Sequence, residues 1–158
     1  MIEPGTKAPD FELPNHKGKP VRLSDFAGRK LLLCFYPNDF SPVCSDQLSI
    51  YQEVLPELHE RGVELVGIST DGTWTHNAFR KHLGLEMTLL SDFHPKGEVS
   101  DAYGAYLHEW GTPSRSLVLI DEEGVVRWVH AEETPVTIPG ANLIFDALER
   151  IGEPRTAN

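Results

Sequence analysis

One run of apolar residues most constrains what this chain can fold into. Residues 31–36 read LLLCFY, which is typical of a strand buried on both faces of a sheet, although a buried helical piece has the same pattern. Pro37 ends the run. The residues that follow carry an apolar stripe at spacings of four, three, four and three, made of Cys44, Leu48, Tyr51, Leu55 and Leu58. We therefore expect a central strand, a short loop and an amphipathic helix.

The rest of the chain alternates between strand and helix patterns. Further strands are expected at residues 11–13, 21–23, 63–69, 87–90, 116–120 and 125–129, and further helices at residues 74–83, 95–103 and 141–151. The first two strands and the last two read as hairpins. Pro56 should kink or break the first helix, because its ring clashes with the carbonyl of Gln52. The pattern predicts an α/β fold with one domain at residues 1–151 and a loose tail at residues 152–158.

Cys44 falls in the first turn of the predicted helix. Ser41 is a good N-cap residue, and Pro42 occupies the first helical position, where its missing N–H costs nothing. The free N–H groups and the positive dipole end of a helix stabilise a thiolate over a neutral thiol. Cys44 is thus a candidate nucleophile. A small apolar core residue is the alternative, since free cysteine is among the most buried residue types.

The net charge and the residue composition exclude several classes of binding partner and indicate where the protein is located. The net charge of −10, without a basic cluster, argues against nucleic acid and against an anionic membrane surface. The N-terminus lacks a signal-peptide pattern, no apolar run is long enough to span a membrane, and only two cysteines occur, so we expect a cytoplasmic protein. The seven histidines show no metal-ligand spacing, and we expect no metal and no cofactor. His76 suits packing or hydrogen bonding at a helix start, whereas Trp74 and Trp110 suit either the core or a dimer face.

Several blocks of this sequence resemble the peroxiredoxins, in the order in which that family carries them. Pro37, Ser41 and Cys44 fit the family motif of a proline, three residues, threonine or serine, two residues and the peroxidatic cysteine. Arg115 precedes the block SLVLID, where the family carries its active-site arginine. The other matching blocks are APDF at residues 8–11, VGIS at 66–69, HNAF at 76–79 and LLSD at 89–92. Residues 90–95 and 99–104 look most like the AhpE subgroup, a one-cysteine branch.

The resemblance implies a thioredoxin-like fold, in which helices flank a central mixed sheet and a hairpin lies at the N-terminus. It implies a thiol-specific peroxidase that reduces hydrogen peroxide or organic hydroperoxides through a sulfenic acid on Cys44, and it suggests a homodimer. Donors for the breaking O–O bond would be the Val43 and Cys44 backbone N–H groups, the Ser41 hydroxyl and the Arg115 guanidinium. Pro37 would shield the pocket from water.

The sequence also departs from the family pattern. Gln47 stands where the family commonly has a glutamate, and Ser49 stands where some relatives carry a resolving cysteine. Cys34 lies in mid-strand and suits the core. We therefore expect an external thiol, of thioredoxin, glutaredoxin-like or low-molecular-weight type, to reduce the sulfenic acid on Cys44. Whether Cys34 ever resolves Cys44 stays open, as does the effect of Gln47 on the field at the site.

Two other functions use the same features. A redox sensor or relay protein would use Cys44 stoichiometrically. A thioredoxin-like disulfide reductase would need a second cysteine three residues from Cys44, and Ser41 and Gln47 occupy those two positions.

Overall fold

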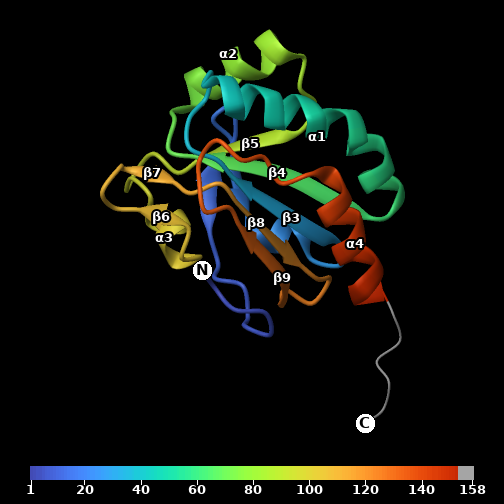
Figure 1. Ribbon diagram of the computed structural model, residues 1–158. Coiled ribbons are helices and arrows are strands. Elements are labelled where there is room, and N and C mark those ends of the chain that lie inside the picture. The colour runs from blue at the N-terminus through green and yellow to red at the C-terminus, as the bar shows by residue number, and fades with distance from the viewer. Residues whose placement is uncertain (153–158) are drawn as a thin grey trace.

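A five-stranded mixed sheet with the order β5-β4-β3-β8-β9 runs through the centre of this computed structural model, which describes residues 1–152 (Figure 1). Its strands are β3 (Lys30–Phe35), β4 (Val63–Ser69), β5 (Thr88–Ser91), β8 (Ser116–Ile120) and β9 (Val126–Ala131). β3, β4 and β5 are parallel, whereas β8 is antiparallel to both β3 and β9. The predicted central mixed sheet is confirmed.

The remaining elements lie around this sheet. The helices are α1 (Pro42–Glu60), α2 (Thr73–Leu83), α3 (Glu98–Ala102) and α4 (Ala141–Gly152), with a 3-10 turn, η1, at Leu23–Phe26. Two small antiparallel sheets pair β1 (Glu12–Pro14) with β2 (Pro20–Arg22), and β6 (Tyr106–Leu107) with β7 (Thr112–Pro113). The N-terminal hairpin, the late hairpin of β8 and β9, and the C-terminal helix were all expected. η1, β6 and β7 were not.

β3 is buried on both faces, as its six apolar residues predicted. Leu32 and Cys34 belong to one core cluster, together with side chains of α1, α2 and α4. Leu31, Leu33 and Phe35 belong to a second cluster, together with the N-terminal segment and α3. Because successive side chains of a strand point to opposite faces, the two clusters are the two cores on either side of the sheet.

α1 buries the whole predicted stripe from Cys44 to Leu58. The expected break at Pro56 is wrong, because α1 continues through it to Glu60, whereas the expected kink stays a prediction. Pro56 is exposed, and Leu55 and Leu58 beside it are buried. Burial of these neighbours holds the helix together, and the carbonyl that loses its donor at the exposed face can bind water.

Two further expectations are corrected, and one open alternative is narrowed. The helix expected at residues 95–103 is only Glu98–Ala102, because Gly97 has a left-handed backbone with φ of +76° that no α-helix continues through. The strand expected at residues 87–90 lies one residue later. Trp74 and Trp110 are 87% and 67% exposed, so neither belongs to the core.

The C-terminal part of the chain ends, in the structure, with α4. The tail expected at residues 152–158 lies outside the described residues except for Gly152, which closes α4. The single domain at residues 1–151 stays a prediction. Within residues 1–152, no helix combines the length and the apolar character needed to cross a membrane.

Gly67 marks a close approach in the core next to the end of β3. It pairs with Leu89 of β5, and a Cβ at this position would lie 2.7 Å from Leu89 Cδ2 and 3.2 Å from the ring of Tyr36. Leu89 and Tyr36 are fully buried. The missing side chain of Gly67 therefore makes room for the Tyr36 ring.

We predict that Gly67→Ala lowers the free energy of unfolding by about 1–3 kcal/mol, because an added methyl group overpacks this core. Urea denaturation measures the change. Leu89→Val removes the nearest atom, so the double variant should lose less stability than the sum of the two single losses. Strict additivity would contradict the proposed overlap of the two side chains.

Candidate active site

The loop that follows β3 delivers Cys44 to the first turn of α1. Ser41 has an extended backbone and caps the helix, since its Oγ accepts a hydrogen bond from the Cys44 N–H at 3.2 Å. Pro42 is the first helical residue. The predicted N-cap and the predicted place of Cys44 are both confirmed. The thiol itself is fully buried.

The pairing of β3 with β8 brings Arg115 to this helix start. Phe35, at the end of β3, lies opposite Ser116, at the start of β8. The residue that precedes β8 therefore lies at the same sheet edge as the loop before α1. Arg115 is 2% exposed, and its Nη2 lies 3.2 Å from Cys44 Sγ. The structure thus places side by side the two residues that the sequence singled out.

Neutral groups hold the Arg115 guanidinium in place. Its Nη1 donates to Gln47 Oε1 and its Nε donates to the Pro135 carbonyl at 2.9 Å. The Gln47 side chain is fully buried, and its Nε2 donates to Tyr51 Oη at 3.3 Å. A buried cation needs a compensating anion. With a glutamine at position 47, the side chains that contact this guanidinium are neutral Gln47 and the thiol of Cys44.

Sequence reasoning found Arg115 but not what holds it. In the sequence, Gln47 is a departure from the family pattern and Tyr51 is part of an apolar stripe, and neither feature indicates a contact with Arg115. Both lie on the Cys44 face of α1, three and seven residues further on, and this spacing was the available signal. The Tyr51 hydroxyl donates to the Pro139 carbonyl at 2.7 Å, 88 residues away. Nothing local in the sequence indicates that contact.

A cavity of about 310 Å³ opens beside Cys44. Pro37, Ser41 and Val43 line it, and so does Arg115, so all the predicted site residues other than the buried Cys44 border this space. Leu107, Trp110, Pro135 and Val136 supply apolar walls. The volume is within the usual range for small-molecule pockets.

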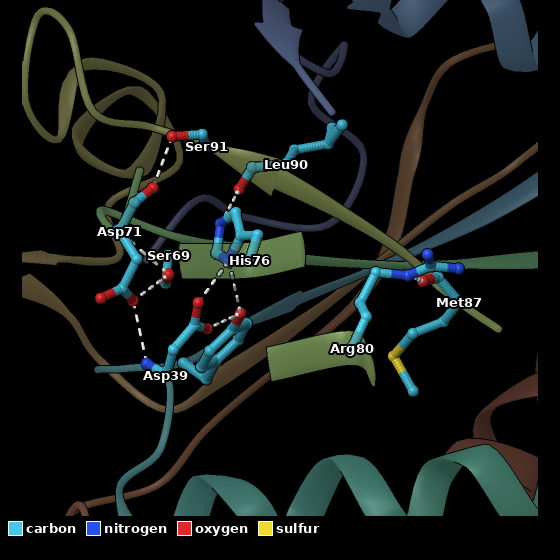
Figure 2. A network of polar contacts seen from close by, with 9 residues as sticks. Asp39, Ser69, Asp71, His76, Arg80, Met87, Leu90 and Ser91 are labelled. Atoms are coloured by element: carbon cyan, nitrogen blue, oxygen red, sulfur yellow. Dashed lines mark hydrogen bonds and ion pairs between the residues drawn. The ribbon is translucent and has the colours of Figure 1, made fainter. Parts of the chain in front are cut away.

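A second polar cluster connects Asp39, in the loop between β3 and α1, with Asp71 and His76 (Figure 2). Asp39, Asp71 and His76 bring potential metal ligands within 4.8 Å of one another. Protein groups already occupy both His76 nitrogens and both Asp39 oxygens, since His76 contacts Asp39 and the Leu90 carbonyl, and Asp39 also contacts Tyr36. These hydrogen bonds account for the cluster without an ion. His76 is fully buried, as the expected packing role requires, but its side chain contacts Asp39 and Leu90 rather than the start of α2.

Comparisons with known proteins identify the family of this chain. The family model of the AhpC/TSA family matches residues 4–129. A "Putative peroxiredoxin bcp" of Coxiella burnetii is 37% identical over 131 residues, which are 79% of this chain and 85% of that protein. "Alkyl hydroperoxide reductase E" of Mycobacterium tuberculosis is 32% identical over 149 residues, or 94% of this chain and 97% of that protein.

Solved structures are similar over nearly the whole chain. The crystal structure of peroxidoxin BcpB from Mycobacterium tuberculosis matches with a TM-score of 0.86 and 28% identity, over 97% of this chain and all of that one. Reduced 2-Cys peroxiredoxin from Plasmodium vivax matches with a TM-score of 0.85 and 29% identity, over 96% of this chain and 82% of that one. The fold is therefore the thioredoxin-like fold of these proteins. Family match, fold and relatives agree that the chain belongs to the peroxiredoxin (AhpC/TSA) family and is a thiol-dependent peroxidase.

Proposed function

We propose that this peroxiredoxin reduces hydrogen peroxide or an organic hydroperoxide through a sulfenic acid on Cys44, and that an external thiol completes the cycle. The observation that carries the proposal is the 3.2 Å contact between Arg115 Nη2 and Cys44 Sγ at the capped start of α1. It joins a nucleophile, a helix N-terminus and a fixed cation in one place.

The proposed step is a displacement at oxygen. The Cys44 thiolate attacks the terminal oxygen of the peroxide, an S–O bond forms and the O–O bond breaks. The departing alkoxide or hydroxide takes a proton to become an alcohol or water. Negative charge thus moves from sulfur to oxygen, and donors aimed at that oxygen stabilise the transition state more than the ground state.

Arg115 suits this role because its guanidinium stays charged and offers several donors in a rigid fork. Two of those donors are held by Gln47 and Pro135, which leaves Nη2 directed at the sulfur. The Val43 N–H lies in the first turn of α1, where backbone donors lack intrahelical partners. The Ser41 hydroxyl already accepts from the Cys44 N–H, and its own proton is free to donate to the peroxide. Pro37 borders the cavity and shields the thiolate from water.

The apolar walls of the cavity support organic hydroperoxides as substrates beside hydrogen peroxide. Side chains such as Leu107, Trp110 and Val136 can contact the carbon part of such a molecule, while its hydroperoxide end faces Arg115.

The position of Cys34 supports resolution by an external thiol. Cys34 is fully buried in the middle of the sheet, paired with Gly67 of β4 on one side and Leu117 of β8 on the other. Burial raises the pKa of the Cys34 thiol to about 12, so it stays protonated at neutral pH. A thiol must ionise to attack a sulfenic acid. Cys34 is therefore a poor resolving residue.

Homodimerisation and a cytoplasmic location remain predictions.

The two cysteines should differ sharply in function. Cys44→Ser should abolish peroxide consumption, whereas Cys34→Ser should leave it nearly intact. Mass spectrometry of protein oxidised with one equivalent of peroxide should show addition of one oxygen, trapped by dimedone on Cys44. Loss of two hydrogens, together with a disulfide between Cys34 and Cys44, would contradict the one-cysteine cycle.

The raised pKa of Cys34 also predicts its reactivity. In the folded protein, iodoacetamide should leave Cys34 unlabelled from neutral pH to about pH 9, since a thiol with a pKa of about 12 remains neutral there. In urea both cysteines should react. Peptide mapping by mass spectrometry measures the labelling, and rapid native labelling of Cys34 would refute its assigned inertness.

Arg115→Ala should slow the reaction with hydrogen peroxide by on the order of a hundredfold, the usual effect of removing one preorganised donor. Arg115→Lys should recover only part of the rate, because one ammonium group cannot reach Cys44, Gln47 and Pro135 together. Rapid mixing with intrinsic tryptophan fluorescence gives the rate constants. Arg29→Ala, which removes an exposed arginine paired with Glu64, is the matched control. Equal rate constants for Arg115→Ala and the control would show that Arg115 does not contribute to the reaction.

A further inference from the structure

Asp39 joins the loop between β3 and α1 to two other segments of the fold, α2 and the turn after β4 (Figure 2). It lies two residues before the N-cap of α1, and its side chain is fully buried. Its Oδ2 is 2.7 Å from His76 Nδ1 of α2, and its Oδ1 accepts from the Tyr36 hydroxyl at 2.6 Å. Its backbone N–H donates to Asp71 Oδ2 at 2.9 Å. The peroxidase mechanism proposed above uses none of these contacts.

The protons of this cluster can be assigned from its geometry. His76 Nε2 is 3.0 Å from the Leu90 carbonyl, which only accepts, so Nε2 carries a proton. Burial and the neighbouring Asp39 raise the pKa of Tyr36 well above its ordinary value, so its hydroxyl stays protonated and donates to Asp39. One further proton then lies between His76 Nδ1 and Asp39 Oδ2. Each of these polar atoms has a partner. Loss of His76 would remove the partner of Asp39 Oδ2, and loss of Asp39 would remove the shortest contact of His76 Nδ1.

Phe40, the residue after Asp39, has a strained backbone conformation that its surroundings must hold in place. Phe40 has a φ of +66°, the one residue other than glycine with a left-handed backbone among residues 1–152. Such a conformation persists only where the surroundings impose it. The Phe40 ring packs against Phe79 and His82 of α2, with centroids 5.0 and 5.7 Å away. α2 therefore holds Asp39 from inside the core and Phe40 from the surface.

We propose that His76 is a positioning residue for peroxide reduction, and that it acts through Asp39. By holding Asp39, it fixes the segment that places Pro37, Ser41 and the first turn of α1 around Cys44. The catalytic part of this inference, the effect of His76 on peroxide reduction, rests on the proposed function. Its structural part, the immobilisation of residues 39–44 by His76, can be measured independently.

Two amide substitutions separate the two hydrogen bonds of His76. The side-chain nitrogen of asparagine can replace Nδ1, and that of glutamine can replace Nε2. His76→Asn thus keeps a donor for Asp39 and loses the Leu90 contact, whereas His76→Gln does the reverse. We expect His76→Gln to slow the reaction with hydrogen peroxide by on the order of ten- to a hundredfold, as misplaced reacting groups do. His76→Asn should retain most of the rate.

Two further variants test the route through Asp39. Asp39→Ala should slow the reaction as much as His76→Gln does, and the double variant should be no slower than either, because both changes break one contact. Ser100→Ala removes a buried hydrogen bond to Asp92, away from the loop. It controls for a general loss of stability and should leave the rate unchanged.

Hydrogen exchange at the backbone amides of residues 39–41, 43 and 44 distinguishes failure of this inference from failure of the proposed function. Exchange should accelerate in His76→Gln and not in His76→Asn, whether or not the protein reduces peroxide. A slow wild-type reaction would overturn the proposed function and, with it, the catalytic role of His76. A fast wild-type reaction with equal rates and equal exchange in both His76 variants would overturn only the inference.

Discussion

A buried arginine in contact with a thiol is the interaction on which the rest of the site depends. Removing a guanidinium from water costs several kcal/mol unless its donors and its charge find partners. Gln47 and the Pro135 carbonyl satisfy two donors of Arg115 without adding negative charge, and the third donor reaches Cys44. The buried guanidinium therefore depends on contacts from α1 and from the segment that contains Pro135, and these contacts fix its position beside Cys44.

The start of α1 is held from two sides. On the β8 side, Arg115 contacts Cys44 itself, and on the α2 side, His76 contacts Asp39 in the loop that leads to the helix. Ser41 lies between these contacts and caps the helix. A thiol in this position is thus oriented by groups on the two sides of β3: β8 is its neighbour on one side, and α2 connects β4 and β5 on the other.

Local patterns predicted the elements best where a clear boundary residue ended them. β4 and α2 have nearly the predicted limits, since Gly84 ends α2 in a left-handed conformation. Local rules failed where packing decided the outcome. Pro56 does not interrupt α1, because buried residues on both sides of it hold the helix, and the helix near Pro95 begins only after Gly97. The small β6–β7 sheet has no strong pattern at all.

The sequence by itself determined that Cys44 lies in the first turn of a capped helix, because capping involves residues only three apart and follows from Ser41 and Pro42. Only the tertiary structure decided what surrounds the thiol. Arg115 is separated from Cys44 by 71 residues and from Gln47 by 68, and His76 is separated from Asp39 by 37. These contacts depend on the register of β3 against β8 and on the packing of α2, which the burial of the whole core sets.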